Sequence, residues 1–259
     1  MKPTDSRLPN SGQEICGFYD VKPALFGQGT LRVTNSKEFG TQQRYWDGFT
    51  FAANGRLPHG ITVGGGLDIG IQVDDHCYTV DAPNQPNNID NTPFGARAAT
   101  VAAGEQVGPF CRIETSWANQ ADFRLRGSVP IKGGFNASFI YRNLPGAEES
   151  ALLTVQTADI ATGRVRFLDP ARTTLTSARA VNLYAPNSVF GPRFSQLDVA
   201  VKKSFPVGVS RLQVALDVYN ALNSNSTQTV ATLYGTSRWL RPTLFLDARV
   251  ARITASLQF

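Results

Sequence analysis

Hydrophobic and polar residues alternate with a period of two along the last third of this 259-residue chain. In the stretch from 193 to 205, one face carries Leu197, Val199, Val201 and Phe205, and the other carries Gln196, Asp198, Ala200 and Lys202. The stretches 210–219 and 252–259 repeat the pattern. A period of two places successive side chains on opposite faces of a β-strand. One face of hydrocarbon and one of polar or charged groups is typical of strands in transmembrane β-barrels.

The same alternation predicts four earlier strands, so that about seven strands are expected along the chain. These four strands are residues 42–56, 61–76, 123–129 and 135–141, and the predicted short turns are 57–60, 130–134 and 206–209. Long polar stretches separate the hairpins, at 77–119, 147–191 and 224–241, and residues 1–41 are expected to be mostly loop. Every second connection is therefore short. Membrane barrels have short turns at one end and long loops at the other.

The composition, with 23 Gly, 16 Phe and a single Met, suits many strands and tight turns better than helices. Charged residues make up 17% of the chain, against roughly 25% in average soluble domains. No apolar run approaches the roughly 18 residues that a membrane-spanning helix needs, so a chain of this kind would cross a bilayer only as strands. The net charge of +5 is spread along the sequence without a basic stripe, and we expect no nucleic-acid partner.

Several segments resemble one family of outer-membrane proteins. GPRFSQLDVAVKKSF, RLQVALDVYNALNSN and LYGTSRWLRPTLFLDARVARITASLQF are similar to the carboxy-terminus of TonB-dependent receptors of the Oar-like group, and GFYDVKPALFG, DHCYTVD and PFCRIE resemble the same group more loosely. The resemblance implies a 22-stranded antiparallel barrel with short periplasmic turns and long extracellular loops. Residues 1–259 would supply about seven of those strands, all of them within 42–259.

The sequence shows no plug, TonB box or regulatory-like domain. It also shows no signal peptide, because residues 1–14 lack an apolar segment and a cleavage site. We therefore expect the carboxy-terminal part of a longer transporter, a fragment that does not transport alone and has no enzymatic activity or cofactor. The resemblance places it in the cell outer membrane of a Gram-negative-type bacterium. The implied partners are outer-membrane lipid, the barrel-assembly machinery, the remainder of the receptor and, through the plug, TonB.

The resemblance also suggests roles for individual residues. An aromatic last residue on an alternating strand, Phe259 with Leu257 and Ile253 in register behind it, is similar to the signal read by the barrel-assembly machinery. Cys77 and Cys111 bracket the long loop 77–119, and the family shows a similar pair. An extracellular setting favours a disulfide between them, with Cys16 left over.

If Phe205 pairs with Ser210, Asp198 and Asp217 lie almost opposite each other on the polar face, where Arg252 can offset both charges. We expect a polar network facing the lumen rather than an acid/base pair. Lys203 would lie on the lipid side near a turn, where its long side chain can reach the headgroups. Four aromatic residues near strand ends are candidate interface residues: Tyr219, Tyr234, Trp239 and Phe245.

Other chemistry is poorly supported. His59 and His76 are the only histidines, and they lack the spacing of a metal site or a catalytic pair. The Gly64–Gly66 run lacks the Gly-Lys-Ser/Thr ending of a phosphate loop and no helix follows it. Two alternatives of other classes remain: a secreted β-sandwich that uses its loops for binding or adhesion, and a hydrolase on a β scaffold, for which no nucleophile arrangement is visible.

Overall fold

The computed structural model of the chain describes residues 1–17, 20, 22–25, 28, 35–38, 40–75, 77, 110–175 and 178–259, and its fold is all-β and antiparallel. The strands are β1 (Gln43–Arg56), β2 (Thr62–Asp75), β3 (Arg112–Thr115), β4 (Asp122–Ile131), β5 (Phe135–Leu144), β6 (Glu148–Glu149), β7 (Leu152–Val155), β8 (Arg179–Asn182), β9 (Val189–Phe190), β10 (Phe194–Val207), β11 (Ser210–Tyr219), β12 (Thr227–Val230), β13 (Pro242–Phe245) and β14 (Val250–Gln258). The helices are short: η1 (Pro23–Leu25), η2 (Ser36–Glu38), η3 (Pro58–Gly60), α2 (Trp117–Gln120) and α3 (Thr157–Ala161). None of the helices among these residues is long and apolar enough to cross a membrane.

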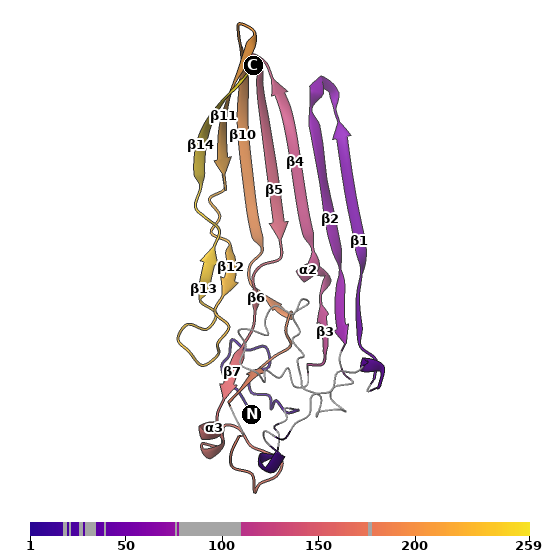
Figure 1. The fold of residues 1–259 in the computed structure, drawn as a ribbon, viewed down its shortest axis with the longest axis vertical. Coiled ribbons are helices and arrows are strands. Elements are labelled where there is room, and N and C mark those ends of the chain that lie inside the picture. The colour runs from indigo at the N-terminus through magenta and orange to yellow at the C-terminus, as the bar shows by residue number, and fades with distance from the viewer. Residues whose placement is uncertain are drawn as a thin grey trace.

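One large sheet organises the molecule. Its strands are hydrogen-bonded in the order β1-β2-β4-β5-β10-β11-β14, with the short β3 pairing with the end of β2. Figure 1 shows the long strands standing side by side, with the tight turns at the end where the chain terminates and the long connections at the opposite end. This is the alternation of short and long connections that the sequence predicts.

Each tight turn has a local cause. The β4–β5 turn uses Gly133 and Gly134 at φ +83° and +80°, a left-handed conformation that glycine adopts without steric cost. The β10–β11 turn consists of Gly208, at φ +59°, and Val209 alone, since Val207 pairs with Ser210. The β1–β2 turn contains η3.

The two-residue β10–β11 turn corrects one sequence-based expectation. Phe205 pairs with Leu212, not with Ser210, so the register is shifted by two residues. The sequence suggests a four-residue turn over 206–209, whereas β10 extends two residues further, to Val207, and leaves only Gly208 and Val209 in the turn. The shift by an even number leaves every side chain on its expected face, because faces alternate with a period of two.

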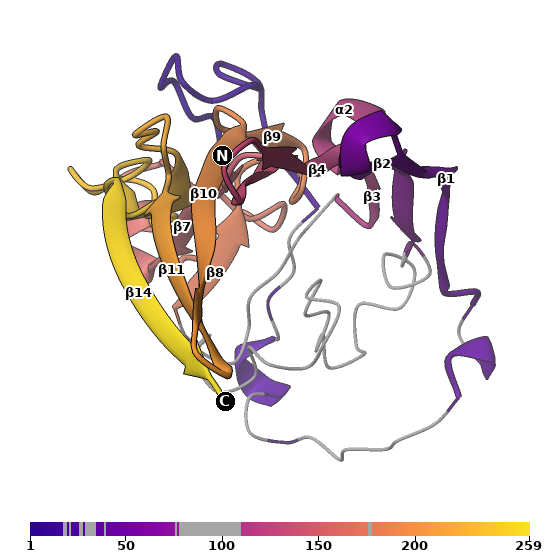
Figure 2. The same cartoon turned by 90° about the horizontal axis from the view of Figure 1, so that it is seen from above.

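The register carries one apolar face across all seven long strands, since directly paired residues lie on the same face. Its members include Phe49, Phe51, Leu67, Ile69, Phe123, Leu125, Phe139, Tyr141, Val199, Val201, Leu212, Val214, Leu216, Ile253, Ala255 and Leu257. Seen from above, the sheet is an arc rather than a closed ring (Figure 2). Within the described chain, β1 and β14 are its two edges.

Residues 1–17 and two of the long connections fold into a second unit, which we call the loop cap: residues 1–17, 145–175, 178–193 and 220–249. It contains three two-stranded sheets, β6–β9, β7–β8 and β12–β13. Its buried core joins all of its segments and consists of Leu8, Ile15, Ala151, Leu153, Val155, Val181, Leu183, Tyr184 and Trp239. Loops that the sequence suggests are polar and irregular therefore pack against one another around hydrocarbon.

Candidate functional site

The apolar face of the large sheet is exposed to the surroundings of the molecule. Phe49 is 61% exposed, Phe51 60% and Ile253 77%. Soluble proteins rarely leave an apolar patch of this extent uncovered, and such patches mark membrane or protein contacts. The face is closely packed within its own layer: the ring of Phe139 lies over Gly127, where a methyl group would come within 2.5 Å of it.

Lys203 is a charge on this apolar face, near the short turns. Its Nζ lies 4.3 Å from the ring centroid of Phe135 and 5.0 Å from that of Phe205. Both rings can stabilise the ammonium group through cation–π interactions. The side chain is thus held at one end of the apolar zone, the position that the sequence analysis suggests for it.

The opposite face of the sheet is polar and rich in charge. Its cations are Arg44, Arg56, Arg124, Arg126, Arg142, Lys202, Arg211 and Arg252, and its carboxylates are Asp68, Asp74, Asp122, Asp198 and Asp217. Three ion pairs lie within it: Arg44–Asp74 at 2.9 Å, Arg124–Asp122 at 2.6 Å and Arg252–Asp217 at 3.1 Å. The sheet is therefore two-faced, with hydrocarbon on one side and water-seeking groups on the other.

The structure brings two of the three residues of the expected lumen network together and separates the third. Asp217 lies directly opposite Arg252, whose guanidinium also stands 5.3 Å from the ring of Tyr219. Asp198 is not opposite Asp217, because the shifted register pairs Asp217 with Ala200.

Asp198 instead belongs to a second cluster, built from the segments SQLD and DVYNALN. Its carboxylate accepts hydrogen bonds from Gln196 Nε2, at 2.9 and 3.0 Å, and from the backbone N–H of Asn220, at 2.8 Å. Asn220 is 2% exposed and adopts a left-handed φ of +49°. Asp198 therefore fixes the point at which β11 ends and the loop cap begins.

The amide of Asn220 completes this junction. Its Nδ2 donates to the carbonyls of Ser224 and Asp247, both at 2.8 Å, and its Oδ1 accepts from the N–H of Ser224 at 2.9 Å. Asn223 makes a similar contact near Asp247, as its Oδ1 accepts a hydrogen bond from the N–H of Arg249 at 3.0 Å. Residues that carry the sequence resemblance thus have a structural task, which is to close the connection between β11 and β14.

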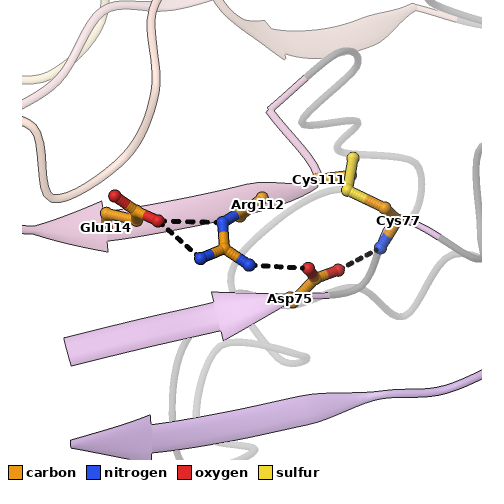
Figure 3. The surroundings of a disulfide bond; sticks show 5 residues. All are labelled: Asp75, Cys77, Cys111, Arg112 and Glu114. Atoms are coloured by element: carbon orange, nitrogen blue, oxygen red, sulfur yellow. Dashed lines mark hydrogen bonds and ion pairs between the residues drawn. A yellow bond between two sulfur atoms is a disulfide. The ribbon is translucent and has the colours of Figure 1, made fainter. Parts of the chain in front are cut away.

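A disulfide and an ion-pair cluster lie together where β2 meets β3 (Figure 3). The sulfur atoms of Cys77 and Cys111 are bonded, with Cα atoms 4.7 Å apart. Arg112 bridges Asp75, at 3.2 Å, and Glu114, at 2.7 Å. Covalent and ionic contacts therefore tie the two ends of the long connection to the sheet.

Two further sequence candidates are Cys16 and His76. Cys16 is an exposed free thiol. His76 and most of the expected 77–119 loop lie outside the described residues, so the structure places only the two ends of that loop.

The loop cap has its own charged contact over its core. The guanidinium of Arg7 stands 4.5 Å from the ring of Trp239, and Asp5 holds it through an ion pair of 2.7 Å. Hydrogen bonds from Arg7 lower the pKa of Asp5 from 3.8 to about 2. Trp239 is 3% exposed and donates to the carbonyl of Ser150, so it is a core residue and not the interface aromatic that the sequence suggests.

The carboxy-terminal strand β14 is an edge strand and is exposed along its whole length. Ile253, Leu257 and Phe259 follow one another at intervals of two or four residues, with Phe259 fully exposed. The expected recognition residues therefore stand free on the same side of an unpaired edge.

Sequence reasoning missed the loop cap core and the role of Asn220. The asparagines of YNALN are a signal for a left-handed turn that closes on itself, because asparagine tolerates positive φ and bonds its neighbouring backbone. Leu8 and Ile15 sit among turn residues and carry no periodic signal.

No protein-family model matches the chain, and no curated protein is significantly similar to it.

Proposed function

We propose that this chain is part of the wall of an outer-membrane β-barrel of the TonB-dependent, Oar-like transporter kind, with the apolar face toward lipid and the polar face toward the lumen. The observation that carries the proposal is the uncovered apolar face that continues through seven hydrogen-bonded long strands. In this assignment the chain has no enzymatic role. Its contribution to transport depends on the remainder of the receptor.

Strand length supports a membrane setting. A tilted strand needs about 9–11 residues to cross the hydrocarbon core. β4, β5 and β11 have 10 residues each, β14 has 9, and β1, β2 and β10 have 14. The strands are long for a globular protein, in which five or six residues are usual.

The arrangement of the connections gives the proposed wall a direction. The short turns would face the periplasm, and the loop cap and the Cys77–Cys111 disulfide would face the cell exterior, where thiols oxidise readily. The loop cap would then form part of the outer vestibule that a substrate meets first.

The secreted β-sandwich is less well supported. A sandwich buries its apolar residues between two sheets about 10 Å apart. Among the described residues no second sheet covers the apolar face, and aromatic side chains such as Phe49 and Phe51 stay exposed.

The proposal is tested by labelling neighbouring residues of one strand in the source cells. Ile253 and Thr254 are adjacent in β14 and lie on opposite faces. In outer-membrane fractions, Ile253→Cys should react with a lipid-soluble maleimide and resist a charged one. Thr254→Cys, the matched control, should react with the charged reagent. Equal labelling of both by the charged reagent would contradict the proposed orientation.

The size of the native protein is a second measurement. An antibody against the last residues should detect a band on the order of 100 kDa in the outer membrane, as a 22-stranded transporter requires. A band near 28.1 kDa in the soluble fraction would instead favour the sandwich.

A further inference from the structure

The polar face holds a pocket of about 580 Å³ near the short-turn end of β1, β2, β4 and β5. Among its lining residues are Asn54, Arg56, Thr62, Arg126, Ser128 and Ile140. It is open to solvent and formed by four neighbouring strands, so its shape depends on the sheet and not on a loop.

Two cations in the pocket have no acidic partner. Arg56 and Arg126 are exposed, and none of the described residues lining the pocket carries a carboxylate. No ion pair of either arginine occurs in the described part of the chain, whereas three other arginines of the polar face are each paired with an aspartate. In the same row of the sheet, Asp198 lies opposite Ile140 but already accepts hydrogen bonds from Gln196 and Asn220.

Asn54 orients one of these cations. Its Oδ1 accepts a hydrogen bond from Arg126 Nη2 at 3.3 Å, across the intervening strand β2. The contact passes over Gly64, where a methyl group would lie 2.3 Å from Asn54 Oδ1 and 3.4 Å from Arg126 Nε. The glycine therefore creates the space in which a guanidinium is held by a neutral acceptor, and its charge is left uncompensated.

Hydroxyl groups and one apolar side chain complete the lining. Thr62 lies directly opposite Arg56, and Ser128, whose hydroxyl donates to Asn136 Oδ1 at 3.0 Å, lies opposite both Thr62 and Ser138. Ile140 is 45% exposed on this predominantly polar face. Guanidinium groups bind carboxylates through paired, charge-assisted hydrogen bonds, and Ile140 can contact the hydrocarbon beside such a group.

We propose that this pocket is a carboxylate-binding site, in which Arg56 and Arg126 bind the anion and Asn54 positions Arg126. The carboxylate can come from an acidic side chain of a polypeptide lying against the polar face or from a small free dicarboxylate. The site goes beyond the proposed function, since binding requires only that the polar face is reached by water.

Residue-specific modification of arginine tests the site. The detergent-solubilised full chain is treated with phenylglyoxal with and without glutarate, and the modification of each arginine is followed by mass spectrometry. Glutarate should slow the modification of Arg56 and Arg126 about tenfold, a factor equivalent to 1.4 kcal/mol of binding. Sodium chloride at the same ionic strength should not protect them.

Arg211 is the matched control, because it is an exposed arginine of the same face that lies outside the pocket. Its modification should stay unchanged by glutarate. Arg126→Gln should remove the protection of Arg56, whereas Arg211→Gln should preserve it. If Arg56 and Arg126 react equally fast with and without glutarate, or if Arg211 is protected to the same extent, the site does not exist.

The same labelling in outer membranes separates the two sources of the carboxylate. Protection of both arginines before any glutarate is added would identify a polypeptide carboxylate in the native protein. Protection only after the addition would identify a small free anion. Absence of protection in both preparations overturns the site without affecting the orientation test on Ile253 and Thr254, so the two proposals fail separately.

Discussion

Asn220 shows how one residue can determine the end of a strand. It leaves β11 in a left-handed conformation, and its side chain satisfies two carbonyls and one N–H of the connection that follows. A buried carbonyl without a donor costs about 1–3 kcal/mol. Losing the Asn220 side chain should therefore destabilise the protein by more than the net free energy of the hydrogen bonds that it makes.

Replacing Asn220 separates the contribution of its side-chain hydrogen bonds from that of its left-handed backbone conformation. Asn220→Ala should destabilise the protein by about 2–4 kcal/mol, as it orphans the two carbonyls and puts alanine, which tolerates the left-handed region less well than asparagine, at this φ. Asn220→Gly should cost about 1 kcal/mol less, since glycine adopts that φ freely. Urea unfolding in detergent measures both. Equal midpoints for the two variants would show that the backbone conformation carries no cost.

Asp5 makes the contact between Arg7 and Trp239 sensitive to acid. Its pKa in the folded protein is about 2, below the ordinary 3.8, so its contribution is present above pH 4 and is lost as the pH falls through 2. In a Trp46→Phe, Trp117→Phe background, acrylamide quenching of Trp239 should rise between pH 4 and pH 2. Asp5→Asn should show the raised quenching at pH 7 and less change with acid. A full acid response in Asp5→Asn would assign it to another group.

At the scale of elements, the β2–β3 junction is held in two ways. Four residue pairs join the strands, and the disulfide closes a connection with a sequence separation of 34. A loop of that length corresponds to about 3–4 kcal/mol of closure entropy.

Removing the disulfide should therefore loosen β3 before the rest of the sheet. Cys111→Ser should raise the hydrogen-exchange rate of β3 amides and lower the unfolding temperature, and reduction of the parent protein should do the same. Cys16→Ser serves as the control, because Cys16 is a free thiol. Unchanged exchange at β3 would mean that strand pairing and the Arg112 ion pairs suffice.

The sequence predicts the hairpins and their faces well because alternation is a local property. The face on which Val199 and Val201 lie can be predicted from their immediate neighbours in the sequence, whatever the partner strand. The register of β10 and β11 is harder to predict from the sequence, as it depends on whether the turn uses two residues or four. The loop cap cannot be predicted from the sequence pattern, since Leu8 becomes a core residue only through packing with Val181 and Trp239, which are distant in sequence.

At the scale of the whole molecule, the two edges of the sheet run in the same direction. Each neighbouring pair in the order from β1 to β14 is antiparallel, so the first and the seventh long strand are parallel. An antiparallel ring cannot close by joining them. Both edges expose unpaired backbone groups, which lipid does not satisfy, and the proposed wall therefore requires further strands between β1 and β14.

Engineered cysteines test this requirement. Gln213→Cys with Ser256→Cys joins residues that are direct partners in β11 and β14, and it should form a disulfide in the outer membrane. Thr50→Cys with Thr254→Cys joins the two edge strands on the polar face and should not, because other strands lie between them in a complete barrel. Both pairs are introduced into the Cys16→Ser chain, so that the native disulfide is preserved. A β1–β14 cross-link at the yield of the control pair would mean that the sheet closes on itself, and the assignment to a larger barrel would then be wrong.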